Sequence, residues 1–265
     1  MKAILTDVTK CIGCERCVSA CRKANDLGQE RPYPWKNEDG LSSDHWCSVV
    51  TKDGYTVRKQ CRHCISPACA SACPVGAFEK TPEGPVTYDG KKCMGCRYCM
   101  MACPYGIPRY AYDSVVPYVR KCQMCYETRV SKGLAPACVE ACPAQATVFG
   151  DRERLLAEAR TRLAENPGKY VQKIFGETEV GGTCVLYLSP IELDFLSLGN
   201  KLDDRPMPSR TVHAMEAVPP VFIGVGIIMT GLHWTIGRRI RLQRERNGLG
   251  ESEQHGHTHK KDGDL

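Results

Sequence analysis

The sequence predicts an α+β protein that carries a repeated cysteine-rich module and a single membrane-spanning helix near its C-terminus. Three observations lead to this fold class. Sixteen of the 18 cysteines fall into four groups of four. Short apolar segments separated by turn residues flank these groups, as expected for short strands. One run of 19 residues near the C-terminus contains no Asp, Glu, Lys or Arg.

Length and composition narrow the class further. The 265 residues fit one or two domains. Charged residues make up 25% of the chain, which excludes general disorder. The net charge of +6 is mild and lacks the strongly basic footprint of a nucleic-acid-binding protein, so no nucleic-acid partner is expected.

The four cysteine groups follow one spacing pattern. The third group has gaps of two, two and three residues and is followed by Pro104, which is the bacterial ferredoxin run for a [4Fe–4S] cluster. The first group has the same gaps, whereas the second and fourth widen the middle gap to four and twelve residues. The pattern predicts sixteen cluster ligands: Cys11, Cys14, Cys17 and Cys21; Cys61, Cys64, Cys69 and Cys73; Cys93, Cys96, Cys99 and Cys103; Cys122, Cys125, Cys138 and Cys142.

The geometry of an iron–sulfur cube accounts for this spacing. Three thiolates on one tight loop reach three irons of a cluster, and the fourth cysteine, farther along the chain, reaches a neighbouring cluster. Gly13 and Gly95 lie inside two of the loops, where a missing side chain allows the backbone to approach the cluster. The prolines after the fourth cysteines redirect the chain. The spacing supports sharing between groups and leaves the pairing of groups open.

Two other uses of cysteine fit less well. Cysteines three apart on one loop are poor disulfide partners. Zinc sites use paired cysteines without a third cysteine three residues on, although the fourth group by itself has the spacing of a four-cysteine zinc site. A zinc-stabilised binding or scaffold protein is therefore the alternative from another class. Cys47 and Cys184 stand outside the groups and are expected to be buried thiols.

The segments around the groups predict short elements. We expect a strand at residues 4–8, a strand–turn–strand unit at 76–88 and, after Gly181-Gly182, a strand at 183–188. A strand, a cluster loop and a short helix that repeat are the two-cluster ferredoxin pattern. Residues 1–150 are therefore expected to form two tandem two-cluster bacterial ferredoxin-like modules, with residues 22–60 as an insertion or long loop.

The segment after these modules predicts a helix and a membrane span. We expect a helix at residues 151–163, capped by Asp151, within an extension (residues 151–215) that reaches toward partner subunits. The uncharged run Val218–Ile236 has the length of a membrane span, which we place at residues 216–238.

Details of the uncharged run support a span and leave one alternative. Pro219 and Pro220 are expected at the entry of the helix, where prolines are tolerated, and Trp234 lies at the far end, where aromatic belts form. A buried core helix is the alternative, because Thr230, His233 and Thr235 make the run partly polar. Residues 239–265 are expected to be a basic segment and then a disordered tail, with solvated rather than metal-binding histidines at His255, His257 and His259.

Charge predicts the orientation of the span. Five arginines follow it directly, and by the positive-inside rule they place the C-terminus in the cytoplasm and the cluster domain at the periplasmic face of a bacterial inner membrane. The N-terminus, however, runs from Met1 straight into the first cysteine group without a signal peptide or twin-arginine segment. Export would then depend on a partner that carries the signal. The five residues are Arg238, Arg239, Arg241, Arg244 and Arg246.

Several stretches resemble the four-cluster beta subunits of molybdopterin oxidoreductase and nickel–iron hydrogenase complexes. The resemblance covers nearly the whole chain. It is strongest to the membrane-anchored iron–sulfur subunit of a respiratory hydrogenase and next to the beta subunit of formate dehydrogenase. The lack of an export signal departs from many such hydrogenase subunits and favours export in the manner of formate dehydrogenase, or a complex that faces the cytoplasm. The stretches are CMGCRYCMMACPY at 93–105, CVEACP at 138–143, FGDRER at 149–154 and EVGGTCVL at 179–186.

The resemblance implies four [4Fe–4S] clusters with cysteines exchanged between paired groups. In such subunits the first and fourth groups share two clusters, and the second and third share the other two. Residues 1–21 with 122–149, and residues 61–121, would then form interleaved modules. The implied ligand sets are Cys11, Cys14, Cys17 and Cys142; Cys122, Cys125, Cys138 and Cys21; Cys61, Cys64, Cys69 and Cys103; Cys93, Cys96, Cys99 and Cys73.

The resemblance also implies an electron-transfer subunit that is not itself an enzyme. It would relay electrons between a large catalytic subunit, of the nickel–iron hydrogenase or molybdopterin type, and a membrane cytochrome b or quinone-binding subunit. A formate dehydrogenase or other molybdopterin oxidoreductase is the alternative to a hydrogenase. His213 and His233 are expected at the membrane interface, with haem ligation as the alternative. Basic residues beside the cysteines either raise cluster potentials or are surface charges: Arg16, Arg62, Lys92, Arg97, Arg120 and Lys121.

Overall fold

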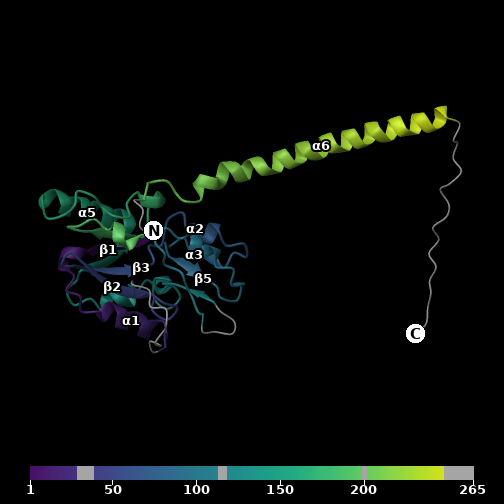
Figure 1. Cartoon of the computed structure of the whole chain (residues 1–265). Helices are drawn as coiled ribbons and strands as arrows, with labels where there is room; N and C mark the ends of the chain where they lie inside the picture. The colour runs from purple at the N-terminus through teal and green to yellow at the C-terminus, as the bar shows by residue number, and fades with distance from the viewer. Residues whose placement is uncertain (29–38, 113–117, 199–201, 248–265) are drawn as a thin grey trace, which may run out of the picture. The chain divides into compact units, whose positions relative to one another are not determined.

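The computed structural model describes residues 1–28, 39–112, 118–198 and 202–247 (Figure 1). Residues Met1–Arg210 form one unit and Thr211–Leu265 form another. The strands are β1 (Lys2–Asp7), β2 (Cys47–Lys52), β3 (Tyr55–Gln60), β4 (Phe78–Lys80), β5 (Val86–Tyr88), β6 (Arg109–Tyr110), β7 (Val119–Arg120), β8 (Thr147–Asp151) and β9 (Val185–Leu188). The α-helices are α1 (Arg16–Ala24), α2 (Ala68–Ser71), α3 (Tyr98–Ala102), α4 (Ala137–Glu140), α5 (Arg152–Glu165) and α6 (Ser209–Arg246). This mixed content is the α+β composition that the sequence predicts.

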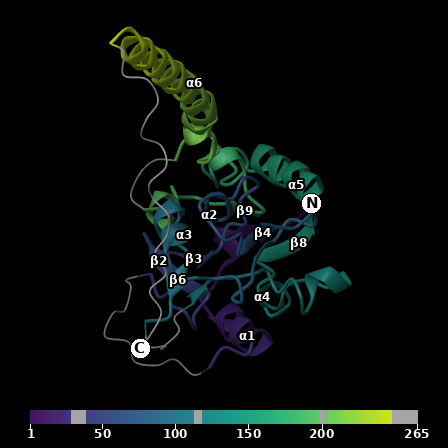
Figure 2. The same ribbon diagram turned by 90° about the vertical axis from the view of Figure 1, so that its right-hand side faces the viewer.

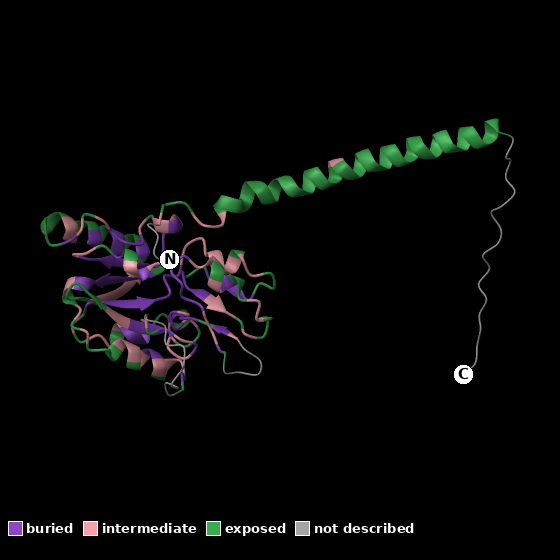
Figure 3. Ribbon diagram, viewed as in Figure 1, coloured by how far each residue is buried: buried purple, intermediate pink, exposed green. Residues whose placement is uncertain are grey.

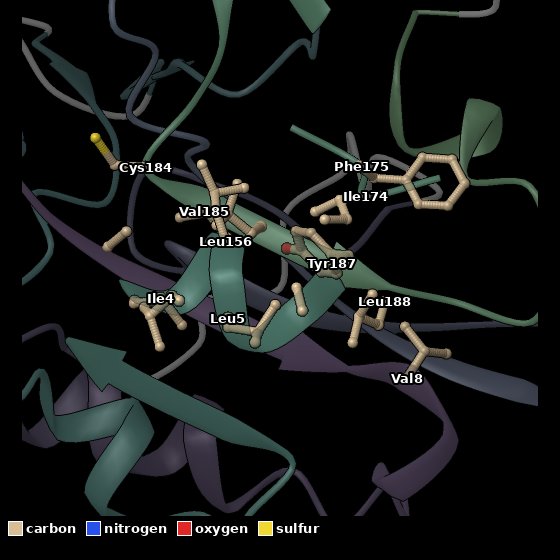
Figure 4. Packing of buried hydrophobic residues seen from close by; sticks show 14 of the residues in the cluster. Ile4, Leu5, Val8, Leu156, Ile174, Phe175, Cys184, Val185, Tyr187 and Leu188 are labelled. Carbon is tan, nitrogen blue, oxygen red and sulfur yellow. The ribbon is translucent and has the colours of Figure 1, made fainter. Parts of the chain in front are cut away.

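A three-stranded sheet of order β8-β1-β9 forms the apolar centre of the first unit. In the middle strand, Ile4 lies opposite Phe149 of antiparallel β8 and opposite Val185 of parallel β9. β1 is buried from its second residue onward and β9 over its whole length. Side chains of both strands therefore pack on both faces of the sheet, as in Figure 4. Residues after 151 thus contribute to the central sheet of this unit.

Helix α5 covers the sheet much as the sequence predicts. The Asp151 side chain accepts a hydrogen bond from the Glu153 amide at 3.2 Å and caps the helix. Leu155, Leu156 and Ala159 are almost completely buried in the same core as β1 and β9. Figure 4 shows Leu156 of α5 among the side chains of that core.

Short helices accompany the cysteine groups and pack in pairs. Figure 2 shows α1 beside α4 and α2 beside α3, and residues of each pair are in contact. Because β1 also pairs with β8, the beginning of the chain lies against residues 137–151. The hairpin of β4 and β5, which pair antiparallel with Phe78 opposite Tyr88, confirms the strand–turn–strand prediction for residues 76–88.

The expectation of a long loop over residues 22–60 is wrong for its second half. Strands β2 and β3 form a regular antiparallel hairpin there, with Val50 opposite Val57. Asp53 and Gly54, between the strands, have φ angles of 50° and 78°. An Asp-Gly pair with two positive φ angles is the connection that best matches the twist of a two-residue hairpin. Part of the first half, including Pro32 and Pro34, lies outside the described residues.

Helix α6 is long and apolar enough to cross a membrane. It has 38 residues, and its most apolar 18-residue window has a mean hydropathy of 1.7 and no buried residue (Figure 3). Thr230 and Thr235 donate their hydroxyls to the carbonyls of Gly226 and Leu232 within the helix, at 2.8 and 2.9 Å. The hydroxyl groups in the run are therefore satisfied within the helix, and the exposure of the window argues against the alternative of a buried core helix.

The entry of α6 differs from the expectation. Pro219 and Pro220 lie inside the helix, which begins ten residues earlier, at Ser209. Proline removes one backbone donor and does not by itself end a helix in which the neighbouring residues keep helical angles. The helical run therefore continues from the predicted span into residues 209–217. The tail from residue 248, with His255, His257 and His259, lies outside the described residues.

Two glycines with the same backbone angle provide a test of the packing beside β9. Gly168 and Gly176 both have φ near 90°, but a Cβ at Gly168 meets nothing, whereas a Cβ at Gly176 would lie 2.7 Å from the Val185 carbonyl oxygen and against the Thr183 hydroxyl. We expect Gly168→Ala to lower the free energy of unfolding by about 1 kcal/mol and Gly176→Ala by roughly 3 kcal/mol. Thermal unfolding of anaerobically purified protein, followed by circular dichroism, measures both. Equal losses would contradict the close packing at Gly176.

Candidate metal centres

All four cysteine loops contain the same left-handed turn. The residue just before the second cysteine has a positive φ in each loop: 68° at Gly13, 50° at His63, 75° at Gly95 and 56° at Met124. Glycine adopts this conformation without strain, and so the sequence revealed it only in the first and third loops. His63 and Met124 carry the strain instead and are both buried.

His63 is held in this strained conformation by contacts to the β4–β5 hairpin. Its Nδ1 accepts a hydrogen bond from the Val86 amide at 2.9 Å, and its carbonyl accepts one from Lys80 Nζ at 3.2 Å. Burial, and then Lys121 and Lys80, hold the pKa of His63 well below its usual value. This side chain is therefore a neutral part of the loop that anchors it to the hairpin.

A second repeated turn explains the prolines after the fourth cysteines. The amides of Gly76, Gly106 and Gln145 donate to the carbonyls of Cys73, Cys103 and Cys142 at 3.3, 3.1 and 3.2 Å. These are β-turns in which proline occupies the second position, where its fixed φ is favourable. Each turn reverses the chain directly after the fourth cysteine of its group.

One cavity collects cysteines from the two ends of the cysteine region. It has a volume of about 440 Å³, including its opening to solvent, and its lining also contains Arg58 from β3. Burial raises the pKa of Cys11, and the nearby thiols of Cys17 and Cys142 raise it further. The cysteines that line this cavity come from the first and fourth groups: Cys11, Cys14, Cys17, Cys138 and Cys142.

A second cavity collects cysteines from the second and third groups. It has a volume of about 360 Å³, including its opening to solvent, and its lining also contains Arg62, Tyr105 and Lys121. The pKa of Cys64 is raised by burial and then by the thiols of Cys103, Cys61 and Cys69. The cysteines that line this cavity are Cys61, Cys64, Cys69 and Cys103.

Two further groups of thiols also lie close together. Burial, followed by the thiols of Cys93, Cys73 and Cys96, raises the pKa of Cys99 to about 12. Cys122 is buried, and the thiols of Cys21, Cys61, Cys138 and Cys125 contribute to its raised pKa. Cys99 therefore lies near two cysteines of its own group and near Cys73 of the second group. Cys122 lies near two cysteines of its own group, near Cys21 of the first group and near Cys61 of the second.

Amide groups point at several of these sulfurs. The backbone amides of Ala77 and Met124 donate to Cys73 Sγ at 3.2 Å and to Cys122 Sγ at 3.3 Å. The Asn25 side-chain amide lies 3.7 Å from both Cys21 Sγ and Cys125 Sγ, and so joins the first group to the fourth. Hydrogen bonds to sulfur stabilise thiolates and are one of the factors that set iron–sulfur potentials.

The lining of the first cavity fits an anionic cluster. Arg58 lines this cavity and is 2% exposed, and none of its three guanidinium nitrogens has a hydrogen-bond partner within the described residues. A buried cation without a partner is costly, so this environment suits an anionic group surrounded by thiolates.

The two remaining cysteines are buried, and the basic residues beside the cysteine groups are either buried or exposed. Cys47 and Cys184 are 1% and 0% exposed, which confirms their burial. The Cys47 thiol donates to Cys17 and, as the largest cause, lowers the pKa of Cys17 to about 6. Of the basic residues beside the cysteines, Arg62 and Lys121 are buried. The others are exposed: Arg16, Lys92, Arg97 and Arg120.

Comparison with known proteins agrees with these donor sets. Residues 53–152 match the family described as a 4Fe-4S dicluster domain. The hydrogenase-2 operon protein HybA of Escherichia coli O157:H7 is 40% identical over 248 residues, which cover 78% of this chain and 75% of the relative. The formate dehydrogenase-O iron-sulfur subunit of Escherichia coli K12 is 34% identical over 247 residues, covering 86% and 79%. The chain belongs to this family of iron–sulfur subunits.

A further relative extends the match along the chain. A protein of Nitratidesulfovibrio vulgaris is 39% identical over 259 residues, which cover 91% of this iron–sulfur subunit and 68% of the relative. The family resemblance drawn from the cysteine stretches is thereby confirmed.

Substitution of two buried cysteines can distinguish the candidate cluster ligands from the other thiols. Cys138 and Cys184 are 6% and 0% exposed; Cys138 lies among other thiols, and Cys184 Sγ accepts a hydrogen bond from Lys80 Nζ at 3.3 Å. We expect Cys138→Ala to remove about four irons per chain and Cys184→Ala to remove none. Iron analysis of the anaerobically purified variants measures this difference. Equal iron loss in the two variants would contradict the separation.

Proposed function

We propose that the four thiol sets each hold one [4Fe–4S] cluster. Every set contains three cysteines of one group and one of another, which is the sharing that the ferredoxin spacing predicts. The packing of α1 on α4 and of α2 on α3 supports two interleaved modules, residues 1–21 with 122–149 and residues 61–121. The proposed ligand sets are Cys11, Cys14, Cys17 and Cys142; Cys21, Cys122, Cys125 and Cys138; Cys61, Cys64, Cys69 and Cys103; Cys73, Cys93, Cys96 and Cys99.

The order of the thiol sets is the observation that carries the function. The Cys17 thiol of the first set lies near Cys138 of the next, and both raise the pKa of Arg58. The Cys61 thiol contributes to the raised pKa of Cys122, which joins the two modules. The Cys99 thiol contributes to the raised pKa of Cys69. This proximity connects the set of Cys61, Cys64, Cys69 and Cys103 with the set of Cys73, Cys93, Cys96 and Cys99. The four sets therefore form one continuous series through the chain.

A continuous series of buried donor sets suits an electron-transfer subunit. Bound [4Fe–4S] clusters supply one-electron transfer and require no further catalytic group. The protein holds each site with thiols, directs amides at sulfurs such as Cys73 and Cys122, and keeps Cys21, Cys99 and Cys138 away from water. We propose that this chain is a non-catalytic relay subunit of an oxidoreductase complex.

The relatives indicate the class of partner. We propose a large catalytic subunit of the nickel–iron hydrogenase type, because the match to a hydrogenase-2 operon protein has 40% identity. A molybdopterin-type partner such as that of a formate dehydrogenase is the second candidate, since the match to a formate dehydrogenase iron-sulfur subunit covers 86% of this chain. A membrane cytochrome b or quinone-binding subunit would receive or donate electrons at the other end.

Helix α6 is the proposed membrane anchor. Five exposed arginines follow its apolar run, between Arg238 and Arg246, and by the positive-inside rule they favour a cytoplasmic C-terminus and a periplasmic cluster domain. His213 and His233 are both exposed on this helix, and we propose that they contact the membrane partner. The inner membrane is the proposed location of the complex.

Metal analysis tests the relay directly. We expect about sixteen irons and sixteen sulfides per chain, a brown colour, and a low-temperature paramagnetic signal after dithionite reduction. Anaerobic iron, sulfide and zinc determination on detergent-purified protein measures the composition. A colourless protein with stoichiometric zinc would establish the scaffold alternative instead.

Removal of α6 tests the membrane anchor. A chain that ends at residue 208, produced without its partner subunits, is expected in the soluble fraction with its iron content unchanged, because no residue of α6 is buried. The matched control removes only residues 248–265 and is expected to stay with the membranes. Fractionation by ultracentrifugation measures both, and a shortened chain that stays in the membrane pellet rejects α6 as the anchor.

A further inference from the structure

Arg58 differs from the other buried arginines of the described structure. Arg152 donates to the carbonyls of Thr183 and Glu177 at 3.0 and 2.9 Å. The Arg62 guanidinium stacks 4.0 Å from the Tyr187 ring centroid and 5.2 Å from that of Tyr105. Arg58, in contrast, has no hydrogen-bond partner for Nε or either terminal nitrogen within the described residues. Its charge is therefore directed at something other than a carbonyl, a carboxylate or an aromatic ring.

The groups around the Arg58 side chain are thiols. It lines the cavity of Cys11, Cys14, Cys17, Cys138 and Cys142, and the thiols of Cys138, Cys47 and Cys17 act on its charge together with the Tyr187 hydroxyl. The backbone carbonyl of Arg58 accepts the Tyr187 hydroxyl at 2.8 Å, which fixes this part of β3. The guanidinium is thereby held between the first thiol set and the set of Cys21, Cys122, Cys125 and Cys138.

The strand places one cation on each of its faces. Side chains alternate along β3, so Lys59 points away from the Arg58 side. Lys59 Nζ forms an ion pair with Asp39 at 2.8 Å, and Arg109 also pairs with that carboxylate. Two adjacent buried cations therefore differ, because Lys59 is paired with a carboxylate and the Arg58 guanidinium has no hydrogen-bond partner within the described residues.

We propose that the positive charge of Arg58 raises the reduction potentials of two clusters. These are the cluster held by Cys11, Cys14, Cys17 and Cys142 and the cluster held by Cys21, Cys122, Cys125 and Cys138. The inference rests on the proposed function. Addition of one electron makes a cluster more negative, and a fixed cation a few ångström away in a buried site stabilises that reduced state. Because no carboxylate pairs with Arg58 in the described structure, its charge is not compensated and can stabilise the reduced clusters.

An electron paramagnetic resonance redox titration of the full detergent-purified chain tests the proposal. In Arg58→Met we expect the potentials of two of the four clusters to fall, so that the ratio of reduced to oxidised cluster at the wild-type midpoint falls by about tenfold. Arg58→Lys keeps the charge and is expected to return both potentials toward wild type. The matched control is Lys59→Met, which removes a neighbouring cation and is expected to leave all four potentials unchanged.

Each outcome decides the proposal. Four unchanged potentials in an Arg58→Met protein with full iron content would overturn it, as would an equal shift in Lys59→Met. If Arg58→Met loses iron, the Arg58→Lys variant decides: retained iron and wild-type potentials support the role of charge, and equal iron loss overturns it. A wild-type chain without clusters would instead reject the proposed function, so the two failures are distinguishable.

Discussion

The meeting of cysteines from distant groups is the constraint on which the rest of the first unit depends. Cys21 lies among Cys122, Cys125 and Cys138, more than 100 positions later in the sequence. This meeting requires α1 to pack on α4, and the pairing of β1 with β8 holds the same two regions together. Cys73 and Cys103 impose the same requirement on α2 and α3. The observed packing is therefore the one that the proposed sharing of cluster ligands requires.

The apolar cores of the first unit differ in their cysteine content. The largest core joins β1, β9 and α5 and consists almost entirely of aliphatic and aromatic side chains. The two smaller cores contain cysteines among their central members, such as Cys21, Cys61 and Cys122 in one and Cys99 in the other. Clustered thiols have raised pKa values through burial and mutual repulsion, and a metal that binds thiolates removes this conflict. Metal binding should therefore contribute to the stability of these two cores, whereas apolar packing stabilises the core around the three-stranded sheet.

Sequence patterns revealed what is local and missed what depends on tertiary neighbours. The spacing of residues 93–104, the Asp151 cap and the apolar run of α6 each depend on short-range chemistry, and the structure contains the corresponding loop, helix start and exposed helix. The β2–β3 hairpin also had a local signal in Asp53-Gly54, which the surrounding prolines and glycines obscured. The left-handed His63 had no such signal, because its strain is compensated by the Val86 amide, a contact made 23 residues away. Arg58 likewise looks like an ordinary polar strand residue until β3 is placed beside the first cavity.

The two cysteine-lined cavities differ in their electrostatics. In the second cavity the buried cation Lys121 donates to the carbonyls of Val86 and Cys122, and Arg62 is stacked on aromatic rings. These contacts take up part of each charge, whereas Arg58 beside the first cavity has no such partner in the described structure. Because a compensated cation stabilises an added electron less than an uncompensated one, equal ligand sets need not give equal potentials. In the proposed relay, the clusters beside Arg58 of β3 would therefore have higher potentials than clusters with the same ligands beside the second cavity.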